Sequence, residues 1–132
     1  MPWIQNKTIR ENILFGSEYD EAKYQKVIKL CQLENDLAHF PGGDQTELGQ
    51  RGENLSGGQK ARISLARAVY RDAQVLVMDD PISALDKKVM SQIFAQLFLK
   101  ELKHKTRILV THSVDYLQHF DKIVLIKKGK IE

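Results

Sequence analysis

The sequence of 132 residues lacks the features that mark disulfide-rich and membrane-spanning proteins. It contains one cysteine, Cys31, so no disulfide framework can form within it, and such usage suits a reducing compartment. No apolar run approaches the roughly 18 residues of a membrane-spanning helix. The densest apolar stretch, Ile93–Leu99, is interrupted by Gln96. These absences exclude a disulfide scaffold and leave an ordinary globular domain.

The sequence also has little excess of charge of either sign. Twenty Lys and Arg residues against 17 Asp and Glu residues give a net charge of +3, too small an excess to indicate a nucleic-acid partner. No Cys/His spacing predicts a zinc site. Hydrophobic residues make up 42% of the sequence and charged residues 28%, which is typical of a folded domain rather than a disordered one.

The first third of the sequence predicts helices. Thr8–Glu11 has the spacing of a capping box, so a short helix is expected from there to about Gly16. Asp20 can cap a second helix, whose apolar residues recur at helical spacing: Tyr24, Val27, Ile28 and Cys31. The glycine-punctuated, polar stretch 42–54 is expected to be turn and loop.

The remainder predicts an α/β layer. A basic helix with one apolar stripe is expected from Gly58. The apolar runs Val75–Met78, Ile108–Val110 and Ile123–Ile126 suit strands buried on both faces of a parallel sheet. A long helix, roughly Lys87–Lys103, connects the first two, which is the strand–helix–strand order of α/β folds. Gly129 in a run of lysines is expected to turn a short hairpin.

A serine and two glycines stand directly before the basic helix, in the order Leu55, Ser56, Gly57, Gly58 and Gln59. Glycines allow a backbone to approach a ligand closely. A helix start offers unpaired N–H groups and a positive dipole end to an anion, to which Ser56 adds a hydroxyl. The alternative is that Ser56 is simply the N-cap of an ordinary helix, which for such a short motif alone is the commoner case.

Two carboxylates and a histidine follow the first two expected strands. Asp79 and Asp80 end the first strand, and His112 follows the second, so all three are expected along one sheet edge, where α/β proteins bind ligands. There Asp79 could hold Mg²⁺ through water and Asp80 could orient an attacking water. Pro81 disfavours helical backbone at Asp80. The alternatives are that the carboxylates only terminate the strand and that His112 is an ordinary surface histidine.

In this order the motifs resemble the ATP-binding-cassette (ABC) family of ATPases. Leu55–Gln59 matches the family's signature LSGGQ without a change, and Val75–Asp79 resembles its Walker B strand. Ser83–Asp86 resembles the D-loop and His112 the switch histidine. The resemblance implies an α/β fold: part of a P-loop NTPase (RecA-like) core with an inserted ABC helical subdomain.

Finer features resemble first nucleotide-binding domains of the multidrug-resistance-associated (C) subfamily. Trp3–Asn6 and Arg10–Gly16 look like the stretch after the Q-loop, and Thr46–Gly52 looks like the exporter X-loop. The resemblance implies that Phe15 and Glu47 contact the transmembrane domains of a transporter. The alternatives are a core aromatic for Phe15 and a solvated loop around Glu47.

The phosphate-binding Walker A loop, G-x-x-x-x-G-K-[ST], has no match, because Gly42–Gly43 and Gly57–Gly58 lack its spacing and its lysine. We therefore expect the C-terminal part of a nucleotide-binding domain, with the helical subdomain at about 8–57 and the Walker B half of the core at about 58–132. Asp80 stands where the family usually has glutamate. First domains of the C subfamily often have aspartate there, which implies a weakly hydrolytic site.

The resemblance implies an ATPase domain that powers an exporter from the cytoplasmic face of a membrane, with ATP and Mg²⁺ as cofactors. Asp79 is expected to serve the metal, and Asp80 and His112 catalysis. The residues expected to meet ATP held by a second nucleotide-binding domain, or to link the two domains, are Leu55, Ser56, Gly57, Gly58, Gln59 and Asp86.

Two other functions stay open from the sequence. Asp80 favours a regulatory module in which nucleotide gates a transporter or channel without appreciable hydrolysis. A soluble ABC ATPase that acts on DNA or ribosomes is disfavoured by the X-loop-like stretch and by the small net charge of +3.

Overall fold

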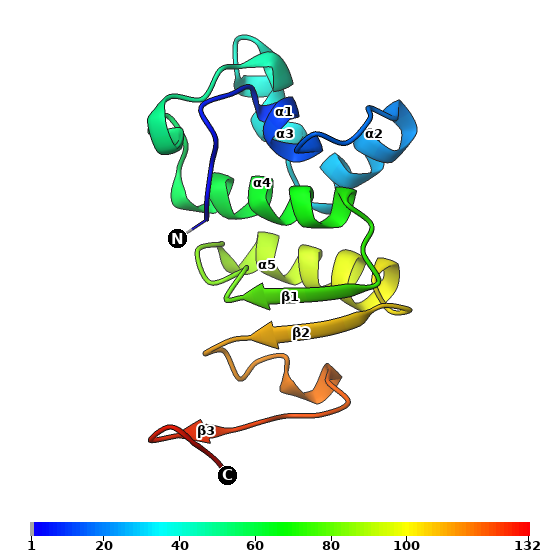
Figure 1. The fold of residues 1–132 in the computed structure, drawn as a ribbon, viewed down its shortest axis with the longest axis vertical. Coiled ribbons are helices and arrows are strands. Elements are labelled where there is room, and N and C mark those ends of the chain that lie inside the picture. Colours follow the sequence, from blue (N-terminus) through cyan, green and yellow to red (C-terminus); the bar gives the residue numbers. More distant parts are fainter. Residues whose placement is uncertain (1) are drawn as a thin grey trace.

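The computed structural model describes residues 2–132 as a mixed α/β structure (Figure 1). Within these residues no helix has both the length and the apolar character needed to cross a bilayer. The elements in chain order are α1 (Ile9–Leu14), α2 (Glu21–Leu30), α3 (Glu34–His39), the 3₁₀ turns η1 (Gly43–Gln45) and η2 (Gln50–Gly52), α4 (Gly57–Tyr70), β1 (Val75–Asp79), α5 (Lys87–Ile93), its π-helical continuation η3 (Phe94–Glu101), β2 (Thr106–Val110), the 3₁₀ turn η4 (Leu117–His119), β3 (Ile126–Lys127) and β4 (Lys130–Ile131).

The predicted starts of the first two helices are confirmed. Thr8 and Glu11 form the capping box of α1, in which each side chain accepts from the other residue's backbone N–H. Asp20 caps α2 by accepting from the backbone N–H of Lys23. Helix α1 ends at Leu14, and its C-cap Phe15 has a left-handed backbone with φ 46°. Local hydrogen bonds at the helix ends therefore decide these boundaries.

Helix α4 is the centre of the molecule. It lies between the α1–α3 segment on one side and the layer of β1 and α5 on the other (Figure 1), and it packs against α1 and α2. The predicted stripe is largely buried at Ala61, Leu65 and Val69, and Ile63 and Tyr70 on other sides of the helix are buried too. A helix covered from two sides buries more than one stripe.

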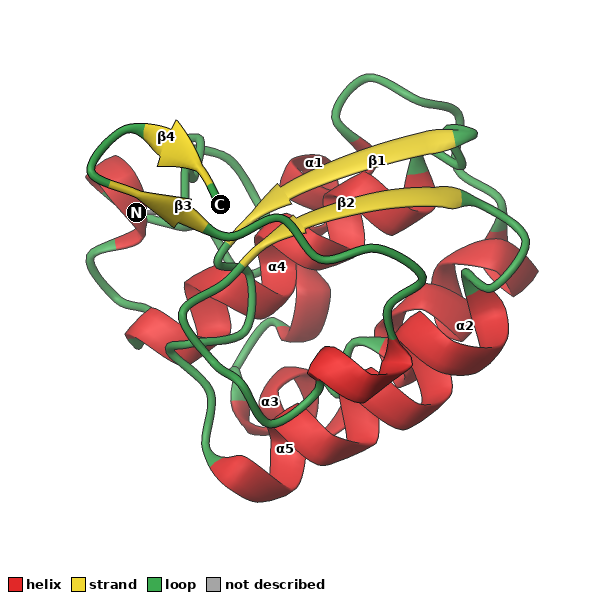
Figure 2. Ribbon diagram, turned by 90° about the horizontal axis from the view of Figure 1, so that it is seen from below, coloured by secondary structure: helices red, strands yellow, loops and turns green. Residues whose placement is uncertain are grey.

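Strands β1 and β2 form the predicted parallel pair, in a register from Val75 opposite Thr106 to Asp79 opposite Val110. The expectation that these strands are buried on both faces is wrong. Residue burial alternates along β1, and the Val77 side chain is 72% exposed while its neighbour Met78 is buried. Figure 2 shows the two strands side by side, with α4 and α5 to one side of them. The strands have one covered face because helices pack on one side only.

The prediction of a third buried strand at Ile123–Ile126 is also wrong. Residues 123–125 are irregular and exposed, and only β3, Ile126–Lys127, is a strand, paired antiparallel with β4 rather than with β2. An apolar run becomes a buried strand only where a neighbouring strand and a covering layer receive it. The predicted hairpin turn at Gly129 is confirmed, with φ 74°.

The long helix predicted from Lys87 begins there and ends at Glu101, two residues earlier than expected. Ile93 and Leu97 are fully buried on its inner side, and Val89 packs at the edge of the core. Phe94 stacks on Tyr116, with ring centroids 4.1 Å apart, which ties the segment after β2 to this helix. The helix thus lies on one side of the sheet and contributes to its covered face (Figure 2).

Candidate functional site

The Ser56–Gln59 segment forms the first turn of α4. Ser56 Oγ accepts a hydrogen bond from the backbone N–H of Gln59 at 3.1 Å, and the backbone N–H of Ser56 donates to Gln59 Oε1 at 2.9 Å. This is a capping box, so the N-cap interpretation of Ser56 is correct in this structure. The Ser56 hydroxyl remains a donor at an exposed helix start, so the cap leaves it able to meet an anion.

The two glycines of the segment have different surroundings. A Cβ atom on Gly57 would meet nothing within 4 Å, so Gly57 is open to an approaching molecule. A Cβ atom on Gly58 would lie 3.2 Å from the backbone oxygen of Ala84 and 3.6 Å from Leu85. Gly58 therefore makes room for the chain's own 83–86 segment. The Cα of Gly57 is thus open and that of Gly58 is packed, and the ligand-facing role expected for both glycines stays a prediction.

The predicted common edge at the ends of the two strands is confirmed. Asp79 pairs in register with Val110, and the backbone N–H of Asp80 donates to the Val110 oxygen at 2.8 Å. His112 stands two residues beyond the end of β2, on the same edge. Asp79 and His112 are exposed and Asp80 is half-buried. The two carboxylates and the imidazole thus follow the carboxyl ends of two paired parallel strands.

Asp80 has an unusual backbone. Pro81 is expected to keep Asp80 out of helical dihedrals, and φ at Asp80 is 47°, in the left-handed region rather than the right-handed helical one. Among residues other than glycine, aspartate is one of the few that adopt this region with any frequency. The turn is supported by a weak hydrogen bond from Ser83 Oγ to the Asp80 backbone oxygen at 3.4 Å. Backbone strain of this kind occurs preferentially at functional sites.

Asp86 serves as the N-cap of α5. Its Oδ1 atom accepts from the backbone N–H groups of Lys88 and Val89, both at 3.0 Å. Asp86 is exposed, and its second carboxylate oxygen has no partner among the described residues. The cap fixes the end of the 83–86 segment, next to the start of α4 at Gly58.

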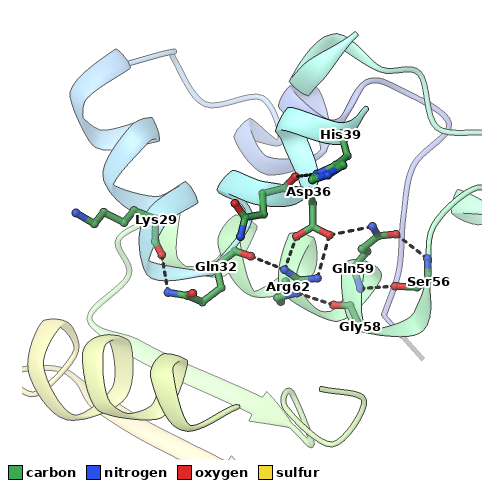
Figure 3. Close-up of polar contacts among 9 residues, drawn as sticks. Lys29, Gln32, Asp36, His39, Ser56, Gly58, Gln59 and Arg62 are labelled. Atoms are coloured by element: carbon green, nitrogen blue, oxygen red, sulfur yellow. Dashed lines mark hydrogen bonds and ion pairs between the residues drawn. The ribbon is translucent and has the colours of Figure 1, made fainter. Parts of the chain in front are cut away.

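A polar cluster beside the Ser56–Gln59 segment was missed by the sequence analysis (Figure 3). Arg62 donates to the Asp36 carboxylate, to the backbone oxygen of Gln32 and, at 3.3 Å, to that of Gly58. Gln59 Nε2 donates to Asp36 Oδ1 at 2.9 Å. The helical spacing of Arg62 to Gly58 and Gln59 is visible in the sequence. Its partner Asp36 is 26 residues away, so no local pattern could identify it.

A second arginine organises the N-terminal segment. Arg67 donates to the backbone oxygen of Asn12 at 2.7 Å and to that of Trp3 at 3.0 Å, and burial lowers its pKa from the ordinary value. Its guanidinium lies over the rings of Trp3 and Phe15, which meet edge to face with centroids 5.7 Å apart. Phe15 is 48% exposed, so it is not a core aromatic. Two aromatic rings are thus presented at the surface beside α1.

Glu47 lies beside the other end of α1. It is exposed, and its backbone forms an isolated antiparallel bridge with Thr8, the N-cap of α1. Asn54 donates to the Glu47 backbone oxygen at 3.2 Å, which supports the loop from within. The Glu47 side chain is therefore free at the surface while its backbone is held in place.

Metal and thiol chemistry have little support elsewhere in the chain. Among residues 2–132 no group of three or more His, Cys, Asp or Glu side chains could hold a metal ion. Asp79 as a Mg²⁺ residue therefore fits only a metal held mainly by water and substrate phosphates, which is the usual mode for Mg²⁺. Cys31 is buried and burial raises the pKa of its thiol to about 12, so it is neither nucleophile nor ligand at neutral pH.

The comparisons with known proteins define the class. The family described as ABC transporter matches residues 2–83, which is more than half of the chain. Together with the LSGGQ helix start and the carboxylates at the end of β1, this match shows that the chain belongs to the ABC transporter family, as part of its ATP-binding domain.

The relatives lie in the C subfamily, as predicted. The chain is 56% identical over 131 residues to ATP-binding cassette sub-family C member 2 of Mus musculus. The aligned region covers 98% of this chain and 8% of that protein. It is 52% identical over 132 residues to ABC transporter C family member 8 of Dictyostelium discoideum, with the same coverage. It is 50% identical over 133 residues to multidrug resistance protein mrp-7 of Caenorhabditis elegans, and the aligned region covers 99% of this chain and 9% of that protein. The chain thus spans less than a tenth of the length of these relatives.

Proposed function

We propose that this chain is the signature-bearing and Walker B part of a first-type nucleotide-binding domain in a C-subfamily exporter. In this proposal, closure of two such domains around ATP is coupled to transmembrane transport. The observation that carries the proposal is the unaltered LSGGQ sequence at an exposed helix start, with Ser56 as cap and Gly57 open to solvent. Unpaired N–H groups and a positive dipole end at such a place suit the phosphates of a nucleotide held by a partner domain.

The finer fold follows the same proposal. Residues of about 8–57 form the inserted ABC helical subdomain, and those of about 58–132 form the Walker B half of a P-loop NTPase (RecA-like) core. The packing of α4 against α1 and α2, with β1 and α5 on its other side, supports a helix that joins the two parts.

The sheet edge is the proposed ATPase site of this domain. Asp79 holds Mg²⁺ through water, and the metal neutralises phosphate charge when it is bound. Asp80 accepts a hydrogen bond from the attacking water and His112 donates to the γ-phosphate. The register of β1 against β2 supports this assignment, because it brings all three residues to one edge.

The proposed partners are a second nucleotide-binding domain and the transmembrane domains. Leu55, which is buried, anchors the signature turn, while the nucleotide of the partner domain is faced by Ser56, Gly57, Gly58 and Gln59. Asp86, which is exposed, reaches across the interface. The exposure of Phe15 and Glu47 at the two ends of α1 supports a contact with transmembrane helices at the cytoplasmic face. No nucleic-acid partner is proposed.

The test is Ser56→Arg in a chimeric transporter, in which this chain replaces the matched residues of the mouse relative, 56% identical to it. We expect ATP binding to persist and ATP-driven closure, measured by cross-linking of the two domains, to be lost, because the long side chain occupies the space beside Gly57. Ser91→Arg on α5 is the control, since Ser91 is exposed and far along the chain from the signature. Closure at the parental level in Ser56→Arg would refute the proposed function.

A regulatory module with little hydrolysis is the second candidate, and Asp80 favours it. Its carboxylate is one methylene shorter than the glutamate usual in the family, and its backbone is left-handed. ATP that closes the chimeric transporter without measurable turnover at this site would support the regulatory function.

A further inference from the structure

The Asp36–Arg62 ion pair joins α3 to the first turns of α4 and is largely shielded from water. The Asp36 side chain is 16% exposed and the Arg62 side chain 12%. Shielded charges are costly unless hydrogen bonds satisfy them. Here Arg62 Nη2 donates to Asp36 Oδ1 at 3.2 Å and Nη1 donates to Oδ2 at 2.5 Å, so both carboxylate oxygens accept hydrogen bonds.

Gln59 is the residue through which this pair reaches the signature. Both polar atoms of its side-chain amide form hydrogen bonds. Nε2 donates to Asp36 Oδ1 at 2.9 Å, and Oε1 accepts from the backbone N–H of Ser56 at 2.9 Å. Figure 3 shows Gln59 between Asp36 and Ser56. With Asp36 in place the amide has one orientation, the one in which its oxygen meets Ser56. Without Asp36 nothing among these contacts would hold the Nε2 end.

Arg62 links the cluster to the backbone on both sides. It donates to the backbone oxygen of Gln32, before α3, and to that of Gly58, in the first turn of α4. The cluster thus contacts the signature at a backbone oxygen and at a side-chain amide. A shift of α3 relative to α4 would be transmitted to both places, because charge-assisted hydrogen bonds have narrow geometry.

We propose that Asp36 and Arg62 are positioning residues for the signature sequence: they hold the side chain of Gln59, and through it the Ser56 turn, in the orientation that meets the partner domain's nucleotide. This inference rests on the proposed function of Leu55–Gln59. The inference assigns to α3, through Asp36, an influence on the closure of the two nucleotide-binding domains around ATP. The sequence motifs do not predict this role for α3.

The experiment uses Asp36→Ala in the chimeric transporter, with Asp44→Ala as a matched control. Asp44 forms a comparable ion pair with Arg10 at 2.7 Å, and its side chain is 15% exposed, but it does not contact the signature. We expect Asp36→Ala to lower ATP turnover at saturating ATP about tenfold, since small displacements of positioning groups are costly. ATP binding to the open transporter and turnover of Asp44→Ala should each stay within about twofold of the parent.

A double-mutant cycle separates positioning from stability. If Asp36 acts through Gln59, then Asp36→Ala should cause no further loss of turnover in a Gln59→Ala background, whereas its effect on thermal unfolding should remain. Additive losses of turnover, or equal turnover in Asp36→Ala and Asp44→Ala, would overturn the inference. If Asp36→Ala does not fold, Asp36→Asn is judged by the same criteria. Parental closure in Ser56→Arg would instead overturn the proposed function, and the inference with it.

Discussion

Aspartate at position 80 combines a short carboxylate with a left-handed backbone. With φ at 47°, its side chain leaves the strand end in a direction that an extended residue would not take. Its N–H group is bound to the Val110 oxygen at 2.8 Å, so the backbone itself is well held. In the proposed ATPase site, the reach of the side chain rather than the mobility of the turn would therefore set how closely the carboxylate approaches the attacking water.

This reasoning predicts the effect of Asp80→Glu in the chimeric transporter. The added methylene moves the carboxylate about 1 Å towards the water, and we expect hydrolysis at this site to rise about tenfold. The measurement is ATP turnover with the opposite site disabled. The rise should disappear in the background of His112→Ala or Asp79→Asn, because the base acts only when phosphate and metal are held. Unchanged turnover would favour the regulatory module.

At the scale of the elements, the start of α4 is shared between two contacts. Its Gly57 side faces open space and its Gly58 side faces the 83–86 segment. The first glycine leaves room for another molecule, and the second allows the chain's own backbone to approach. A single motif of five residues therefore includes both an open surface position and an internal packing position.

The two glycines should respond differently to the same substitution. Alanine is favoured over glycine in helices by up to about 1 kcal/mol, so Gly57→Ala should leave the free energy of unfolding unchanged or slightly higher. Gly58→Ala places a methyl group against the Ala84 oxygen and should lower it by about 1–2 kcal/mol, a typical cost of overpacking. Urea denaturation of the 132-residue chain measures both. Equal stabilities would contradict the packing assigned to Gly58.

For the whole molecule, the important feature is the uncovered face of the sheet. Val75 and Val77 of β1 and Ile108 and Val110 of β2 are exposed there, each by 50% or more. Such a patch favours association, because burial of apolar surface is stabilising. Each of the two strands is paired on one side only among the described residues, which adds open hydrogen-bonding edges.

We therefore expect the 132-residue chain to self-associate at micromolar concentration and to bind a hydrophobic dye. Val77 pairs in register with Ile108, so Val77→Lys combined with Ile108→Glu places opposite charges side by side on this face. The double variant should reduce both dye fluorescence and the average mass in sedimentation. The control, Ala22→Glu with Gln25→Lys, adds the same charges on the exposed side of α2. Equal association in both variants would exclude the sheet face as the cause.

Sequence reasoning was most successful where local chemistry decides the structure. The caps at Thr8, Asp20 and Ser56 and the parallel pairing of the two strands could all be predicted, because hydrogen bonds between near neighbours and the strand–helix–strand order determine them. The same holds for the family, since the signature is a contiguous motif. The domain boundary near residue 57 and the catalytic roles of Asp79, Asp80 and His112 stay predictions.

The tertiary structure decided what depends on distant partners. Whether Val77 and Ile123–Ile126 are buried depends on which layers cover them, so the apolar runs by themselves predicted burial that is absent. The left-handed backbone of Asp80 arises within the turn after β1, against the local preference before proline. The contact of Asp36 with Arg62 and Gln59 joins segments 23 to 26 residues apart. A sequence specifies its near-neighbour hydrogen bonds directly, but burial and charge pairing exist only once the chain has brought remote residues together.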